Sequence, residues 1–370
     1  MHRFAVRITP DDLGAIARWF YVKMLKAGYT SICEFHYVHH APDGAPYGHR
    51  AELAQRVVQA AADTGIGMTM LPVLYQYSGF GAQAPRGNQR RFINTPDALL
   101  RIVDDLRRAQ LERGDLRYGG APHSLRAVSE ASLRTLLKGL DALAPDAPVH
   151  IHIAEQTAEV DACMEAEGAR LVRWLLDRFD VDARWCLVHA THTDAGETTA
   201  LARSGAVAGL CLMTEANLGD GVFPAHDYLD ANGAFGVGSD SHIGVDWRAE
   251  LRLLEYGQRF ARPERNVLGR AGRRCARHRA RGRPARSGHA RTGSCSMPII
   301  RTSRSKRRVH GSRRSCSLST AARRSTISTR ADDASSSKAV IAMKHACTRT
   351  IARCCRACSR IRERIQGPHP

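Results

Sequence analysis

Between residues 30 and 242 one pattern repeats: a short run of apolar and β-branched residues, then a longer stretch with helical spacing. Strands that alternate with helices in this way form parallel sheets, so the sequence predicts an α/β fold. The first helix should have Thr9 as its N-cap, Pro10 at its first position and Gly28 at its end. Helices are expected at 8–28, 96–114, 129–143 and 248–261, and strands at 30–37, 67–75, 116–125, 149–155, 184–192, 206–213 and 235–242.

Polar residues gather where these strands end, which is the edge at which a (β/α)8 barrel builds its active site. A doubly wound sheet is the alternative. It is disfavoured because no glycine-rich phosphate loop follows the first strand. The chain opens with a helix that leads directly into a strand. We therefore expect a (β/α)8 barrel that lacks its first strand.

The composition changes near residue 269. Residues 1–268 hold 28 of the 55 basic residues, 33 of the 36 acidic residues and every aromatic residue. A basic, polar segment without aromatic residues buries too little apolar surface to fold alone, so residues 269–370 should form a disordered tail. A reading-frame shift near residue 270 of a G+C-rich gene would produce such a composition. The alternative is a basic module for nucleic acid or anionic membranes, but it lacks aromatic residues that stack on bases.

The cysteines of the first 268 residues are scattered and show no pairing rhythm. No apolar run reaches about 18 residues, and the first residues lack the layout of a signal peptide. These features predict a cytoplasmic protein.

Histidines are dense where the predicted strands end. In the strand VHIHIAE, a period of two places His150 and His152 on one face, with His152 nearer the end. A neutral imidazole there suits a divalent transition metal, and Glu155 can turn back over the same space as general base and acid. The plain alternative is a histidine-rich strand followed by a surface glutamate.

Other strand ends carry further candidates. Asp240 ends the strand FGVGSDSH and can bind a metal or orient its water, although Gly-Ser-Asp is also an ordinary turn. His189 ends the strand WCLVHATH and could instead be a histidine at the edge of the core. Arg126 can pair with a substrate carboxylate, and Tyr37 can add a hydroxyl group. Residues 214–221, TEANLGDG, should form a polar loop that contacts substrate.

Nine segments together resemble one family: EFHYVHH, LPVLY, RRFIN, PHSLRAV, HIHIAEQ, CLVHATH, TEANLGDG, GSDSH and LEYGQR. With these, residues 1–268 resemble the formimidoylglutamate deiminases of the amidohydrolase superfamily. The histidine, glutamate and aspartate motifs alone would indicate only a metal-dependent deaminase of that superfamily. The resemblance implies an amidohydrolase barrel with one zinc ion that hydrolyses N-formimino-L-glutamate to N-formyl-L-glutamate and ammonia, a step of histidine degradation.

The resemblance also implies a role for individual residues. His152 and Asp240 match metal ligands, and Glu155 matches the residue that shuttles protons. His189 matches the residue that polarises the substrate or orients the attacking water. The positions that match the substrate site, where a dianionic glutamate moiety needs cationic and hydroxyl donors, are Tyr37, His123 and Arg126.

Two departures from the family pattern accompany this resemblance. The family has a further His-x-His pair on its first barrel strand, which supplies two of four protein metal ligands and lies N-terminal to anything present here. We therefore expect a truncated or misassigned start and weak zinc binding. The small β domain of family members has no visible sequence, and the basic tail replaces family-like sequence.

Two other functions stay open. One is another zinc deaminase that acts on a guanidine, an amidine or an aminated heterocycle, favoured if Arg126 points away from the pocket. The other is a non-catalytic chain with nucleic-acid affinity through the tail. The expected partner is a small-molecule substrate, with no membrane and no specific nucleic acid, and a homodimer stays open.

Overall fold

The computed structural model describes residues 7–109, 114–263 and 265–268. These residues belong to the first of two compact units, Met1–Arg301. The second unit, Thr302–Pro370, and the predicted disordered tail at 269–370 lie outside the described residues.

Strands and helices alternate through the described part of the chain, as the sequence pattern predicts. The strands are β1 (Ser31–His36), β2 (Gly67–Leu74), β3 (Leu116–Tyr118), β4 (Ala121–Pro122), β5 (Val149–Ile153), β6 (Trp185–His189), β7 (Val207–Leu210) and β8 (Ala234–Val237). The helices are α2 (Pro10–Ala27), α3 (Glu52–Thr64), the short 3₁₀ turn η1 (Gly87–Gln89), α4 (Pro96–Ala109), α5 (Glu130–Leu143), α6 (Thr157–Glu167), α7 (Leu171–Arg178), α8 (Ala195–Ser204), α9 (Leu212–Leu218), α10 (Ala225–Asp230) and α11 (Trp247–Ala261).

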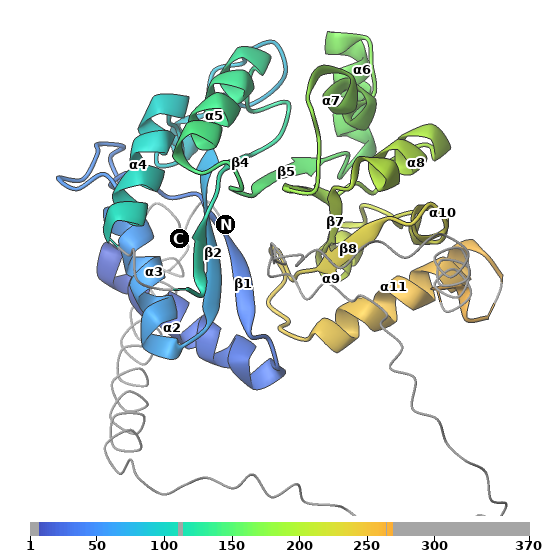
Figure 1. Cartoon of the computed structure of the whole chain (residues 1–370), viewed down its shortest axis with the longest axis horizontal. Coiled ribbons are helices and arrows are strands. Elements are labelled where there is room, and N and C mark those ends of the chain that lie inside the picture. The colour runs from blue at the N-terminus through green and yellow to red at the C-terminus, as the bar shows by residue number, and fades with distance from the viewer. Residues whose placement is uncertain (1–6, 110–113, 264, 269–370) are drawn as a thin grey trace, which may run out of the picture. The chain divides into compact units, whose positions relative to one another are not determined.

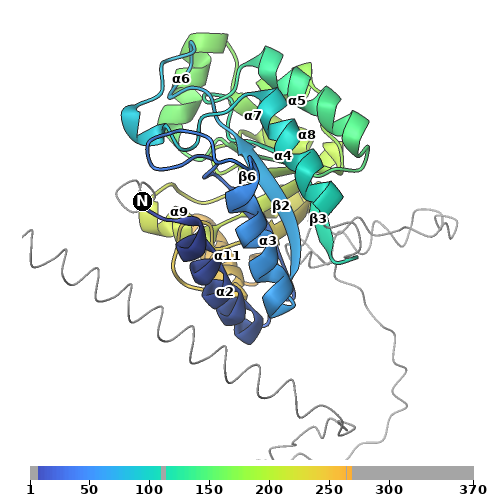
Figure 2. The same cartoon turned by 90° about the vertical axis from the view of Figure 1, so that its left-hand side faces the viewer.

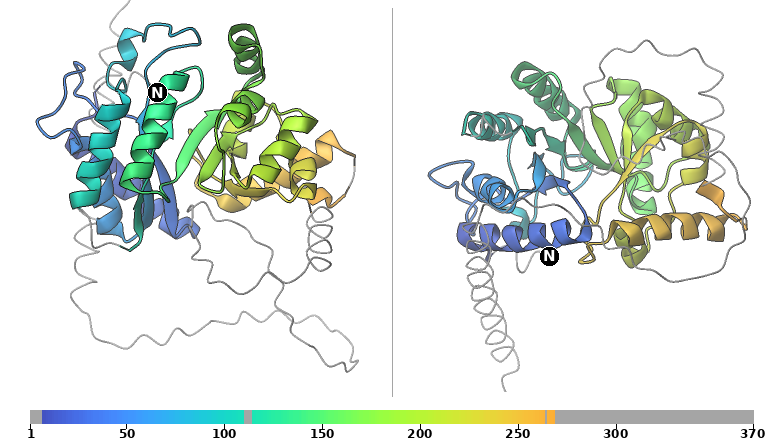
Figure 3. Two further views of the ribbon diagram at one scale, coloured as in Figure 1. Left: turned by 45° about the horizontal axis from the view of Figure 1, so that its top comes forward. Right: turned by 60° about the horizontal axis from the view of Figure 1, so that its bottom comes forward.

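All pairings between these strands are parallel, in the orders β1-β2-β3, with β4 also on β2, and β5-β6-β7-β8. A bridge between Gly120 and Val149 connects the two sheets. Helices lie along the outside of the strands (Figures 1 and 3). Within the described residues, the outer edges of β1 and β8 have no strand partner. The α/β prediction is confirmed, and the strand order is that of a barrel open between β8 and β1.

One predicted strand is wrong in its detail. Residues 116–125 form two short strands, β3 and β4, which are separated by Gly119 and Gly120. A Cβ atom at Gly119 would overlap the backbone oxygen of Pro148, so the chain passes its neighbour where only glycine fits. This close approach interrupts the strand.

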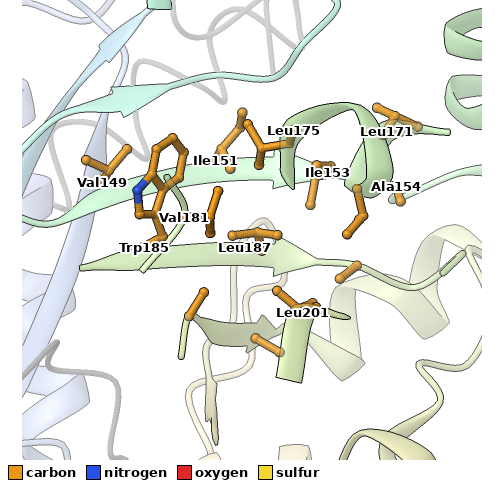
Figure 4. Packing of buried hydrophobic residues seen from close by; sticks show 14 of the residues in the cluster. Val149, Ile151, Ile153, Ala154, Leu171, Leu175, Val181, Trp185, Leu187 and Leu201 are labelled. Atoms are coloured by element: carbon orange, nitrogen blue, oxygen red, sulfur yellow. The ribbon is translucent and has the colours of Figure 1, made fainter. Parts of the chain in front are cut away.

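The two faces of β5 have different surroundings, as its alternating sequence requires. Val149, Ile151 and Ile153 point outward into the largest buried cluster, where they pack with residues of α7 and β6 (Figure 4). His150 and His152 lie on the opposite face, and both rings contact Phe35 of β1, with centroids 5.7 and 4.7 Å away. The predicted shared face of the two histidines therefore points to the inside of the curved sheet.

Helix α2 packs along α3 (Figure 2). Its predicted limits are confirmed: Thr9 accepts a hydrogen bond from the Asp12 N–H, and Gly28 has a left-handed backbone with φ 96°. The indole of Trp247 donates to the carbonyl of Ala27 at 3.2 Å, which ties α11 to the end of α2. In the described residues, no helix is long and apolar enough to cross a membrane.

The expected substrate loop at 214–221 is wrong in its first part, because α9 covers residues 212–218. Thr214 and Glu215 are fully buried and lie in this helix. The loop begins only at Gly219, whose φ of 78° ends the helix.

Candidate functional site

The residues of the candidate site stand at the carboxyl ends of β5, β6 and β8. The backbone there is strained: Ala154, His189, Ala190 and Asp240 all have positive φ, between 45° and 68°. Non-glycine residues adopt this conformation at a cost of roughly 1–3 kcal/mol each, and such strain concentrates at functional sites. The strained backbone at these three strand ends is therefore typical of a functional site.

His152, near the end of β5, is buried and oriented by the backbone. A hydrogen bond of 3.0 Å joins its Nδ1 to the carbonyl of His123, which leaves Nε2 available to a ligand. Burial, and then the neighbouring His189, lower the pKa of His152 to about 4. A neutral imidazole whose Nδ1–H is held by a carbonyl is the form in which histidine binds metals.

Asp240 and His152 line one cavity of about 280 Å³ between the open edges of β1 and β8. Phe35 and Tyr37 from the β1 side line it too. Both donors are of the kind that zinc takes. In the ranges that the structure describes, however, no group of three or more histidine, cysteine, aspartate or glutamate side chains is arranged to hold a metal ion. The two donors fit a metal in kind but do not complete its coordination.

Glu155 and His189 face each other across the ends of β5 and β6. The Glu155 Oε1 atom lies 3.6 Å from Nε2 of His189, a buried atom that has no hydrogen-bond partner among the residues that the structure describes. Burial raises the pKa of Glu155, and the charges of Asp220 and Asp240 add to this. Burial would lower the pKa of His189, but its bond to Glu215 and the surrounding carboxylates raise it. A carboxyl group with a raised pKa beside an imidazole suits proton transfer near neutral pH.

Sequence reasoning missed Glu215. Its Oε1 lies 3.2 Å from Nδ1 of His189 and also accepts the Cys211 N–H at 2.9 Å. The only signal in the sequence is an acidic residue soon after an apolar run, in a segment expected to be a loop. That pattern does not show where the carboxylate points.

An aromatic wall stands beside His152. The His123 ring stacks on the His152 ring, with 5.1 Å between their centroids. The rings of Tyr37 and Tyr75 meet His123 edge-on, with centroid distances of 5.7 and 4.8 Å. Burial lowers the pKa of His123 well below its usual value and raises the pKa of the Tyr37 hydroxyl. Both side chains are therefore neutral, and Tyr37 can donate a hydrogen bond to a ligand.

Arg126 lies in a neighbouring cavity of about 620 Å³, together with Gln156 and Glu159. Its Nε is 3.9 Å from Glu159 Oε1, which is too long for a hydrogen bond. Its charge nevertheless acts on Tyr37 and Glu155. The structure thus gathers five of the other predicted site residues around His152 and places Arg126 at their edge.

Comparison with known proteins shows the family and the fold of the chain. The model of the amidohydrolase family matches residues 2–286. The chain is 53% identical to formimidoylglutamate deiminase of Pseudomonas aeruginosa over 271 residues, which are 73% of this chain and 59% of that protein. A crystal structure of an amidohydrolase from Brucella melitensis superposes with a TM-score of 0.70 at 48% identity, over 74% of this chain and 61% of that one.

An atrazine chlorohydrolase from Arthrobacter aurescens, complexed with zinc, shares the fold at a TM-score of 0.58 and 21% identity, over 70% of this chain and 56% of that one. The chain thus spans about three fifths of the length of its more similar relatives. The family match covers well over half of the chain and includes every strand described above. This chain belongs to the amidohydrolase family.

Proposed function

We propose that the site hydrolyses the formimino group of N-formimino-L-glutamate and releases N-formyl-L-glutamate and ammonia. The observation that carries the proposal is the pairing of Glu155 with His189 beside His152. The 53% identity to a formimidoylglutamate deiminase supports this choice of substrate.

Glu155 performs the proton transfers of this reaction. It takes a proton from the attacking water while the water oxygen bonds to the formimino carbon. It then passes protons to the former imino nitrogen, which leaves as ammonia when its bond to carbon breaks. Both water protons end on nitrogen and the water oxygen becomes the formyl oxygen, so the atoms balance. The raised pKa of Glu155 suits both accepting and returning a proton.

His189 and the aromatic wall orient the reactants. The unpartnered Nε2 of His189 can hydrogen-bond the attacking water or the oxygen of the tetrahedral intermediate. Tyr37 lines the cavity where the formimino group would lie, and the His123 ring packs against Tyr37 at 5.7 Å. Arg126, from the neighbouring cavity, is the cation that would receive a glutamate carboxylate.

We propose zinc as the cofactor, with His152 and Asp240 as two of its ligands. When bound, zinc would lower the pKa of the attacking water. The support is the shared cavity of the two side chains and the free Nε2 of His152.

The test is ammonia release from N-formimino-L-glutamate with zinc added in excess, together with the zinc content of the purified chain. We expect zinc-dependent turnover that falls by about 100-fold or more in Glu155→Gln, because the proton shuttle is lost. Glu52→Gln, on the outer helix α3, is the matched control and should keep the activity. Turnover that is unchanged in Glu155→Gln, or absent in the unaltered chain, would refute the proposal.

A second candidate is a deaminase of a guanidine, an amidine or an aminated heterocycle. It is favoured by the position of Arg126, which lines a different cavity from His152 and Asp240. Assays with such substrates, beside Arg126→Gln, separate the two. The first candidate is supported if Arg126→Gln loses activity on N-formimino-L-glutamate but not on the other substrates.

We also propose the cytoplasm as the location of the chain and a small molecule as its partner. No disulfide joins any two of the four cysteines in the described ranges, as is usual in a reducing compartment.

A further inference from the structure

Among the described residues, one hydrogen bond, from Nδ1 to Glu215, holds the ring of His189. Its side chain is 1% exposed, and its backbone has a φ of 68°, which a residue of this kind seldom adopts. Glu155 is 3.6 Å from Nε2, beyond hydrogen-bond distance, whereas Glu215 is 3.2 Å from Nδ1. The orientation of the ring therefore depends on Glu215.

Glu215 is itself buried, with 1% of its side chain exposed. Its ionic contacts within the described residues include His189 but no lysine or arginine. Its Oε1 accepts from both the His189 ring and the Cys211 N–H, while Oε2 has no hydrogen-bond partner in the described part of the chain. Burying a carboxyl group costs free energy unless its oxygens accept hydrogen bonds, so the two bonds to Oε1 hold this side chain in place.

The chemistry of imidazole explains what such a contact does. A carboxylate that accepts the Nδ1–H fixes the ring and its tautomer, so that Nε2 points at the reacting group. In this structure Nε2 then faces Glu155 and the space beside His152.

We propose that Glu215 is the positioning residue of His189: by accepting the Nδ1–H it holds Nε2 toward Glu155. The effect of this contact on the reaction rate rests on the proposed function. Its effect on structure, a proton on Nδ1 that is sheltered from solvent, does not depend on the proposed function.

The chain offers a matched control in Glu250 of α11. This side chain is also a buried glutamate, and its Oε2 accepts the Met213 N–H at 3.0 Å, in the first turn of the same helix α9. It supports α9 without any hydrogen bond or ion pair to the His189 ring among the contacts of the described residues. A substitution at Glu250 therefore removes support from α9, as a substitution at Glu215 does, but leaves the contact between Glu215 and His189 in place.

The experiment uses the full chain labelled with ¹⁵N in histidine, and the His189 signals are assigned with a His189→Asn variant. We expect a downfield, slowly exchanging Nδ1–H resonance in the unaltered chain. It should move upfield in Glu215→Gln, whose neutral amide oxygen accepts more weakly, and vanish in Glu215→Leu. Glu250→Gln should leave it in place.

Kinetics provide the second readout. Glu215→Leu should lower kcat by about 100-fold with KM within a few-fold, and Glu215→Gln should recover part of this loss. Glu250→Gln should change thermal stability more than kcat.

Two results would overturn the inference. One is an Nδ1–H resonance that is unchanged in Glu215→Gln, and the other is an equal displacement in Glu250→Gln. Should Glu215→Leu fail to fold, the two glutamine variants still decide. Should the unaltered chain release no ammonia, the proposed function fails while the resonances still decide the role of Glu215.

Discussion

Glu34, on β1, is a carboxyl group whose ionisation opposes folding. Burial raises its pKa from 4.5 to about 7, and the hydrogen bond from the Tyr21 hydroxyl at 2.9 Å only partly offsets this. The native state therefore holds a proton that the unfolded chain releases between pH 4.5 and 7. The protonated Glu34 side chain makes its full contribution to the free energy of unfolding below the pKa of the unfolded state. This contribution is lost as the pH rises through the pKa of the folded state.

We expect Glu34→Gln to raise the free energy of unfolding at pH 8 by up to about 3 kcal/mol, at about 1.4 kcal/mol per pH unit, and to have little effect at pH 4. Glutamine can still accept the Tyr21 hydroxyl but does not ionise. Denaturant unfolding at the two pH values measures the difference, with the exposed Glu165→Gln as control. A gain that is equal at both pH values would show that Glu34 is not protonated in the native state.

The residues around His152 differ in how far the sequence could predict them. Glu155, His189 and Asp240 follow strands, and parallel strands bring their ends to one edge, so periodicity alone places these side chains together. The contact between Glu215 and His189 could not be predicted, because it joins residues 26 positions apart through the orientation of α9.

At the level of elements, α2 is a helix whose start is encoded locally. Thr9 accepts the Asp12 N–H, and Asp12 accepts the Thr9 N–H in return. We expect Thr9→Ala to lower the free energy of unfolding by about 1 kcal/mol, since the first turn loses its cap. Thr9→Ser keeps the hydroxyl group and should restore most of this in thermal unfolding. A serine variant as unstable as the alanine variant would assign the effect to packing of the threonine methyl group.

The elements that the sequence pattern missed depend on distant residues. Helix α9 has only seven residues, and its first turn is capped by Glu250 of α11, 37 positions away. The break between β3 and β4 reflects the approach of Pro148 to Gly119. By contrast, α2 and α5 start at side-chain caps within three residues of their first turn. Their limits could therefore be predicted from local sequence.

For the molecule as a whole, the order of strands has a consequence for its dynamics. Among the described strands, β2 and β6 are paired on both sides, whereas β1 pairs only with β2 and β8 only with β7. An edge strand has backbone N–H groups that no neighbouring strand accepts. In the described part of the chain, the ends of β1 and β8 border the same cavity as His152 and Asp240. Of the two predicted metal ligands, Asp240 thus follows an edge strand, β8, whereas His152 lies on β5 and reaches the same cavity from there.

Amide hydrogen exchange tests this at native conditions. We expect segments 31–36 and 234–237 to exchange faster than 67–74 and 185–189, by a factor on the order of ten, or about 1.4 kcal/mol in opening free energy. Opening of edge strands needs fewer broken hydrogen bonds than opening of central ones. Added zinc should slow exchange at 234–237 through Asp240, and His152→Ala should remove that effect. Equal protection of all four segments without zinc would mean that another strand covers both edges, from this chain or from a second copy.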